Sequence, residues 1–226
     1  MLAVDLGSAS SFAVLAGSGI TIAGPTVSTI NGDIGAFPTA TITGMENAVL
    51  SGINYGGNGI TQAAKLNLVD AYNDAASRSA DFTYSDGSNL SGTLAGGVHQ
   101  SAGSFLINGT LTLDGGGDSN TVWIFQSGST LLAASGSQII LINGAQASNV
   151  FWQVGSSATI GTTTDFSGTI LADQSITLNT GAILNGRALA LNAAVTLDTN
   201  TITVPEPSAV WLFGAASISF FARRRR

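Results

Sequence analysis

The stretch from Ala158 to Thr199, ATIGTTTDFSGTILADQSITLNTGAILNGRALALNAAVTLDT, contains one short phrase three times. The phrase is a threonine followed three residues later by a second threonine, and it begins at Thr159, Thr177 and Thr196. The copies stand 18 and then 19 residues apart, a period typical of a chain that coils and stacks on itself. We therefore predict a β-solenoid in which equivalent threonines of successive coils form a column.

Strand geometry assigns different positions to the two threonines of each phrase. Residues three apart in a regular strand point to opposite faces, so only one threonine of each phrase can lie on a flat outer face. We predict that the first threonine forms the outer column and that the second lies in the turn at its edge. The predicted column residues, with the small residues beside them, are Ser157, Thr159, Ser175, Thr177, Ala194 and Thr196, and the predicted edge residues are Thr162, Thr180 and Thr199.

One helix interrupts the strand pattern, at about residues 61–79. Thr61 is a plausible N-cap. Apolar residues then recur at helical spacing and predict one buried stripe, with Lys65 elsewhere on the wheel. The stripe residues are Ala64, Leu68, Tyr72, Ala75 and Ala76.

The runs TVWIFQ, NVFWQV, TILA and RALAL, which begin at residues 121, 149, 169 and 187, predict the partner of this stripe. They are apolar at both alternating positions, which is typical of strands that are buried on both faces. We therefore expect the helix to cover this side of the solenoid, with Leu68 and Tyr72 near Phe125, Phe151 and Leu189. The strands that carry the threonine phrase alternate cleanly and should remain uncovered.

The composition argues against nucleic-acid binding and against catalysis. Only 9% of residues are charged, and before the last four positions the basic residues are Lys65, Arg78 and Arg187, too few for a phosphate-neutralising patch. There is no cysteine, and the single histidine, His99, is predicted to be a turn or surface residue. A loop, rather than a calcium site, is the favoured interpretation of residues 114–118, DGGGD, because the motif occurs once. We predict no catalytic residue, no metal and no cofactor.

The C-terminal residues combine three features in order. Val204-Pro205-Glu206-Pro207 precedes a short apolar stretch, residues 209–222, and four arginines close the chain. This tail resembles the PEP-CTERM sorting signal of Gram-negative bacteria. The resemblance implies export, contact with the membrane, processing by an exosortase-type enzyme, and release or display at the cell surface. Residues 1–5 lack the basic region and apolar core of a signal peptide, so we expect that the N-terminal leader is not part of this sequence.

The body of the chain resembles the microbial ice-binding proteins. The resemblance rests on TVWIFQSGSTL, on the long stretch from Leu141 to Thr203, on FAVLAGSGITIAG near the start and on AYNDAASR in the helix. It implies a mostly β fold, a right-handed triangular β-helix with one long α-helix packed alongside, in which N-terminal strands complete the stack out of sequence order. The family's pattern on its ice-binding strands maps onto the segments that end at Thr159, Thr177 and Thr196, with Thr21 as a fourth.

Two functions remain open from the sequence. The first is a non-catalytic protein that adsorbs to ice through a flat threonine- and serine-rich face and inhibits ice growth or recrystallisation. The alternative is an extracellular structural adhesin or exopolysaccharide-binding module. We expect a solenoid domain at residues 1–204, a sorting and anchor segment at residues 205–226, and a monomer.

Overall fold

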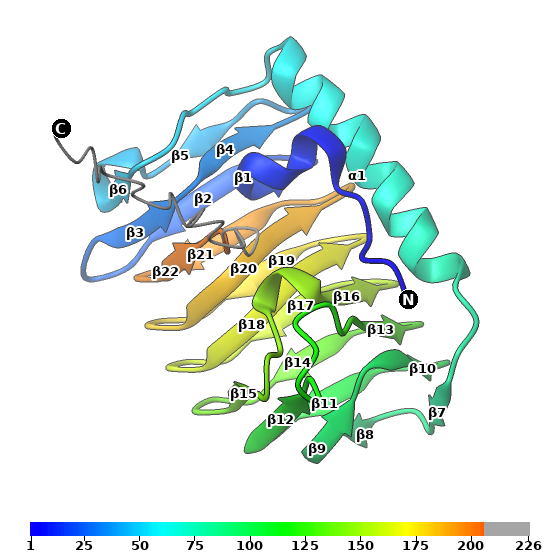
Figure 1. Cartoon of the computed structure of the whole chain (residues 1–226). Helices are drawn as coiled ribbons and strands as arrows, with labels where there is room; N and C mark the ends of the chain where they lie inside the picture. Colours follow the sequence, from blue (N-terminus) through cyan, green and yellow to red (C-terminus); the bar gives the residue numbers. More distant parts are fainter. Residues whose placement is uncertain (206–226) are drawn as a thin grey trace, which may run out of the picture.

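The computed structural model describes residues 1–205 and consists mostly of β-strands with one long helix. The strands form one 14-stranded and one 8-stranded sheet, and every strand pair is parallel (Figure 1). Within residues 1–205, no helix is both long enough and apolar enough to span a membrane. The predicted processing site, apolar stretch and arginine cluster of residues 206–226 lie outside the described residues.

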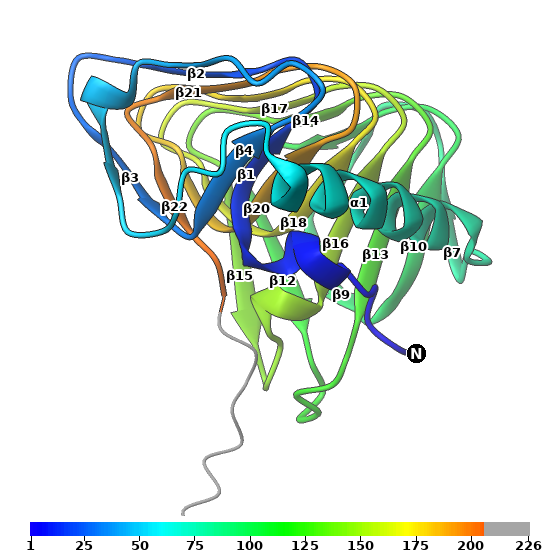
Figure 2. The same ribbon diagram turned by 90° about the horizontal axis from the view of Figure 1, so that it is seen from above.

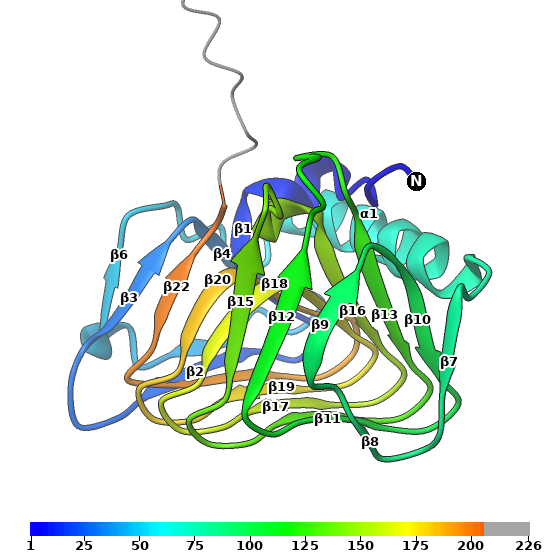
Figure 3. The same cartoon turned by 60° about the horizontal axis from the view of Figure 1, so that its bottom comes forward.

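The 8-stranded sheet forms one side of the stack of coils (Figure 3). Its strands, in spatial order, are β5 (Ile42–Thr43), β2 (Ile20–Ala23), β21 (Val195–Asp198), β19 (Ile176–Leu178), β17 (Ala158–Ile160), β14 (Leu131–Ala133), β11 (Phe105–Ile107) and β8 (Ser88–Asn89).

The 14-stranded sheet supplies two further sides, because two of its strands bend from one to the other. β18 (Asp165–Ala172) pairs through Asp165 with β15 (Gln138–Ile142) and through its last four residues with β16 (Val150–Val154). β20 (Ile183–Ala190) follows the same path beside it. We call the two sides the helix side and the third side. The helix side also contains β1 (Phe12–Ala16), β4 (Asp33–Ala36), β7 (Phe82–Tyr84), β10 (Gly97–Ser101) and β13 (Trp123–Ser127). The third side also contains β3 (Ser28–Asn31), β6 (Ala48–Leu50), β9 (Gly92–Ala95), β12 (Thr110–Asp114) and β22 (Thr201–Thr203).

The coils are not stacked in sequence order. β1, β2 and β3 pair with β20, β21 and β22 respectively, so the N-terminal coil lies on the C-terminal one. The helix α1 (Gly59–Ser77) then runs along the stack to β7 at its opposite end (Figure 1). This arrangement agrees with the out-of-order stacking implied by the family resemblance.

The helix begins two residues earlier than the sequence predicts. Asn58, not Thr61, is the N-cap, and its side-chain oxygen accepts from the backbone N–H groups of Ile60 and Thr61 at 2.9 and 3.2 Å. The Thr61 hydroxyl instead donates to the Gly56 carbonyl at 3.0 Å. The predicted cap is wrong because the preceding asparagine satisfies the free N–H groups of the first turn.

A second apolar cluster lies between α1 and the helix side (Figure 2). Leu68 packs there with Phe151 and Leu189, and Tyr72 contacts the cluster while partly buried, as predicted. The prediction is wrong for Phe125, which points into the interior of the solenoid. In a strand buried on both faces the period of two does not say which face is which, and the neighbouring Ile124 is the residue that meets the helix.

Two further helix positions differ from the predicted stripe. Ala76 is exposed and Ala71 is buried in its place. Lys65 is also buried, and its ammonium donates to the backbone carbonyls of Ala190 and Leu191. Burial lowers the pKa of Lys65 to about 8.

His99 is a core residue, so its prediction as a turn or surface residue is wrong. It lies on β10, where its ring stacks between Phe82 and Phe125 with centroid distances of 4.7 and 4.9 Å. Its Nε2 lies 3.1 Å from the Ala95 carbonyl, which can only accept, so Nδ1 accepts from the Tyr84 hydroxyl at 2.9 Å. Burial lowers the pKa of His99. Both ring nitrogens are thus used in holding the core together.

Candidate functional site

Five threonines stand in one column across the 8-stranded sheet. Thr159 is in register with Thr177, and Thr177 with Thr196. Thr21 of β2 is in register with Thr196 and also with Thr43 of β5. Of these five, the sequence predicted four. Thr43 was missed, although Thr41-Ile42-Thr43 repeats the alternation of the neighbouring strand.

The inward residues on either side of each threonine fix this orientation. Ala158, Ile160, Ile176, Leu178, Val195 and Leu197 are all at most 1% exposed. Because alternate strand residues point to opposite faces, these buried positions force the threonines outward. Parallel strands about 4.8 Å apart then repeat the hydroxyl and methyl groups at that interval. A β-branched side chain is also restricted at χ1, so the column is stiff.

A row of small residues accompanies the threonine column two positions earlier in each strand. Backbone hydrogen bonds align it, as from Ala158 N–H to the Ser175 carbonyl at 2.9 Å and from Ile176 N–H to the Ala194 carbonyl at 3.1 Å. The Ser175 hydroxyl donates to that of Ser157 at 2.9 Å. From one end to the other, the row contains Thr41, Gly19, Ala194, Ser175, Ser157, Thr130 and Ser104. None of these side chains is larger than threonine, so the surface beside the column has no large projections.

The second threonine of each phrase lies in a turn, as predicted from strand parity. Thr162, Thr180 and Thr199 fall between the strands of the 8-stranded sheet and the next strands of the 14-stranded sheet. The Thr180 hydroxyl donates to Asp198 Oδ2, and Thr199 has a positive φ of 55° and contacts the Thr26 carbonyl. Only the position of these residues is established by this geometry, and their part in ice contact stays a prediction.

The column changes character at one end of the sheet. Beyond Thr159, the same register continues with Leu132, Leu106 and Asn89. Leu132 is 45% exposed, which is high for a leucine within a strand. We call Leu132 and Leu106 the leucine segment. The sequence analysis missed it, although LLA and FLI occupy the strand positions one and two coils before the first threonine phrase.

The outward residues of the 8-stranded sheet are almost all uncharged. Asp198 stands at the edge, two residues after Thr196, and is tied to Thr180. The helix packs against β13, β16 and β18 of the other sheet, so it leaves the threonine column accessible (Figures 2 and 3). The side chains of this face can offer hydroxyl and methyl groups in a regular array, but no acid-base chemistry.

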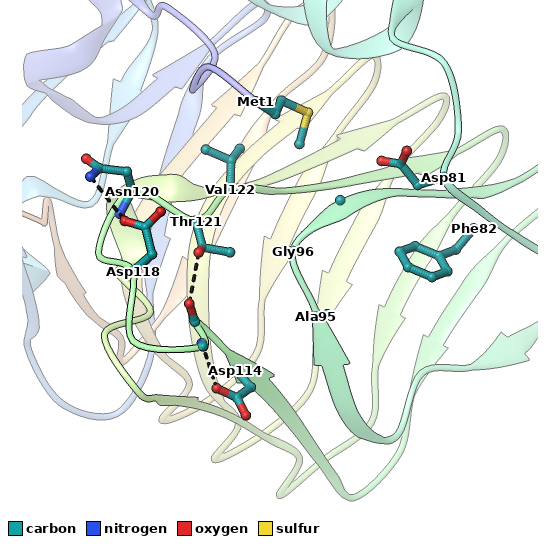
Figure 4. Close-up of a pocket in the computed structure, with 13 residues that line it drawn as sticks. Met1, Asp81, Phe82, Ala95, Gly96, Asp114, Asp118, Asn120, Thr121 and Val122 are labelled. Carbon is teal, nitrogen blue, oxygen red and sulfur yellow. Dashed lines mark hydrogen bonds between the residues drawn. The ribbon is translucent and has the colours of Figure 1, made fainter.

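An acidic hollow of about 580 Å³ lies elsewhere, between β7, β9 and the loop after β12 (Figure 4). Each acid there is engaged within its own segment. Asp114 accepts from Gly116 N–H at 2.9 Å and from the Asn143 amide at 2.8 Å, which lowers its pKa. Asp118 accepts from Asn120 N–H at 2.8 Å, and Asp81 from Val98 N–H at 2.9 Å. Among residues 1–205, no group of three His, Cys, Asp or Glu side chains is placed to hold a metal ion.

Comparison with known families finds two matches, which cover different parts of the chain. Residues 14–203 match the ice-binding-like family, and residues 203–226 match the PEP-CTERM protein-sorting motif. Among curated proteins, the chain is 43% identical to an ice-binding protein of Nostoc sp. (strain HG1), over 98% of the chain and 87% of the relative. It is 36% identical to an ice-binding protein of Flavobacterium frigoris (strain PS1), over 90% of the chain and 77% of the relative.

Solved structures show the same similarity. The ice-binding protein of the Antarctic ascomycete Antarctomyces psychrotrophicus superposes with a TM-score of 0.87 at 40% identity, covering 91% of this chain and all of that one. The DUF3494 domain of Shewanella frigidimarina ice-binding protein 1 gives a TM-score of 0.80 at 30% identity, covering 91% of this chain and 99% of that one.

Proposed function

Because the chain belongs to the ice-binding-like family, we propose that it adsorbs to ice through the threonine column and the row of small residues beside it. The contact residues are Thr21, Thr43, Ser157, Thr159, Ser175, Thr177, Ala194 and Thr196, with Thr162, Thr180 and Thr199 at the edge. Adsorption inhibits ice growth or recrystallisation and involves no catalytic step. The observation that supports this proposal most directly is the unbroken register of five outward threonines.

Rigidity explains why such a face suits ice. The hydroxyl and methyl groups are held by strands whose inner residues are fully buried, and their χ1 angles are restricted. Water next to the face can therefore become ordered before contact, and little conformational entropy is lost when the protein joins the lattice. Ice between adsorbed molecules then grows as curved fronts, and curvature lowers the local freezing temperature.

The fold and location proposals have separate support. A right-handed, triangular β-helix for residues 1–204 is supported by the three sides of the stack and by the similarity to solved ice-binding proteins. Export and surface sorting through residues 205–226, with exosortase-type processing, are supported by the PEP-CTERM match. We propose that the domain acts as a monomer, because one molecule carries the whole column.

The test places one bulky side chain in the centre of the column. Thr177→Tyr should raise the protein concentration needed to inhibit recrystallisation by roughly tenfold or more, since one decade corresponds to about 1.4 kcal/mol of lost contact. Thr201→Tyr is the matched control, because Thr201 is an exposed strand residue of the third side. It should behave like the unmodified protein in ice-affinity and recrystallisation assays, while circular dichroism checks the fold of both variants.

The possible failures are distinguishable. If the unmodified protein is excluded from growing ice, ice adsorption itself is wrong and the adhesin or exopolysaccharide-binding alternative takes its place. If the protein enters ice and Thr177→Tyr does so equally well, the function stands and the assigned face is wrong.

A further inference from the structure

Arg187 is a buried cation near the point where the described chain ends. It lies on β20 and is 6% exposed. Its Nε donates to the Ser10 carbonyl at 2.8 Å, and one terminal nitrogen donates to the Thr169 hydroxyl at 3.3 Å. Within residues 1–205 no carboxylate forms an ion pair with it, and the ion pair found there joins Arg78 to Asp74. A buried charge without a counter-charge is costly, so this guanidinium favours a nearby anion.

Two hollows converge on Arg187. They have volumes of about 590 and 310 Å³, and Arg187, Ser10 and Pro205 line both. One acid borders each hollow, Asp33 in the larger and Asp5 in the smaller, but each accepts a local backbone hydrogen bond. Asp33 accepts from Ile53 N–H and Asp5 from Gly7 N–H, both at 2.9 Å. The negative charge of these two acids is therefore directed to the loops that border the hollows.

The next residue in the chain after Pro205 is Glu206, the acid of the Pro-Glu-Pro motif. We propose that the carboxylate of Glu206 occupies the hollow at Arg187 and pairs with the guanidinium there. The distance is short enough, because one residue advances the chain by at most about 3.6 Å and Pro205 already borders both hollows. The planar guanidinium suits this partner, since it can donate two parallel hydrogen bonds to a carboxylate.

This pairing ties the first residues of the sorting motif to the folded domain. The anchoring point lies at the end of β22, on the edge of the third side away from the 8-stranded sheet (Figures 2 and 3). A tail held at this point leaves the threonine column unobstructed, and the processing enzyme meets a motif that is partly docked. The inference does not depend on ice adsorption.

Thermal unfolding of the full-length chain in mild detergent tests the pairing. Glu206→Gln should lower Tm by roughly 3 °C or more, because breaking a buried ion pair costs several times the 1 kcal/mol that shifts Tm by about 2–4 °C in a protein of this size. The control is Glu46→Gln, which changes the only other glutamate, an exposed residue, and should leave Tm unchanged. Arg187→Lys keeps the positive charge but loses the bidentate geometry, and its effect should shrink when it is combined with Glu206→Gln.

Three results would overturn the inference. The first is a Tm of Glu206→Gln equal to that of the unmodified chain. The second is full additivity of Arg187→Lys and Glu206→Gln, which would mean that the two side chains do not interact. The third is equal stabilisation of the unmodified chain and of Glu206→Gln by added sodium acetate, which would mean that the hollow is open to an external anion. Stabilisation of Glu206→Gln alone by acetate supports the pairing.

Discussion

The helix side and the 8-stranded sheet are built from the same coils, yet their outward residues have opposite character. In β16, every residue from Val150 to Val154 is buried, because α1 covers the outer face. In β17, which follows in the same coil, Ala158 and Ile160 are buried while Thr159 remains partly exposed. The same strand geometry thus yields one surface that stabilises the fold and another that is free to contact something outside the molecule.

Removing side chains from the two surfaces should give opposite results, and the largest expected effect is on the helix side. Leu68→Ala should lower the free energy of unfolding by about 2–5 kcal/mol, because Leu68 is fully buried against Phe151 and Leu189. Thr177→Ala should lower it by less than about 1 kcal/mol. Chemical denaturation measures both. Recrystallisation inhibition, measured where both variants are folded, should fall for Thr177→Ala alone. Equal loss of stability in the two variants would mean that the surfaces do not differ in this way.

The buried Lys65 makes the helix side sensitive to pH in a direction that can be worked out. Its pKa is about 8 in the folded protein and 10.5 as the reference value, so between these values the unfolded chain binds more protons. Stability should therefore rise with pH in this window, by roughly 1–2 kcal/mol between pH 8 and pH 9.5. Urea unfolding at several pH values measures the slope.

Lys65→Met provides the control for this slope. The variant keeps the length of the side chain without a titrating group, so the pH-dependent rise should disappear even if its overall stability changes. A rise of the same size in Lys65→Met would assign the effect to other groups. The threonine column has no titrating side chain, so ice affinity should stay constant over the same pH range.

The sequence predicted the surface that repeats better than the surface that is covered. The spacing of the threonine phrase and its alternation with Ile160, Leu178 and Leu197 identify the outward positions, because each strand there has one wet and one dry face. On the helix side this contrast is missing, so nothing in WIFQS distinguishes Ile124, which meets α1, from Phe125, which fills the interior. His99 and Lys65 were placed wrongly for a related reason. Their burial depends on partners from distant coils, such as Phe125 for His99 and the Ala190 carbonyl for Lys65.

The end of the column was also outside the reach of sequence reasoning. Thr43 and Leu132 belong to the same column as Thr159, but one precedes α1 and the other lies in a coil without the phrase. Only the register of the parallel ladders brings them together. The sequence period therefore identified the centre of the candidate site, while its limits depend on how the coils are stacked.

The smallest expected effect comes from extending the threonine column into the leucine segment. Leu132 is in register with Thr159 and is 45% exposed, so Leu132→Thr should be tolerated and should continue the array by one coil. If hydroxyl groups at this spacing are what ice contacts, the concentration needed to inhibit recrystallisation should fall by about twofold, equivalent to roughly 0.4 kcal/mol of added contact. Ile140→Thr is the matched control, because Ile140 is a strand residue of the third side with 42% exposure. The same gain in both variants would mean that surface polarity, and not register with the column, sets the activity. A loss in Leu132→Thr would assign the exposed leucine methyl groups to the ice contact and extend the face in the opposite chemical sense.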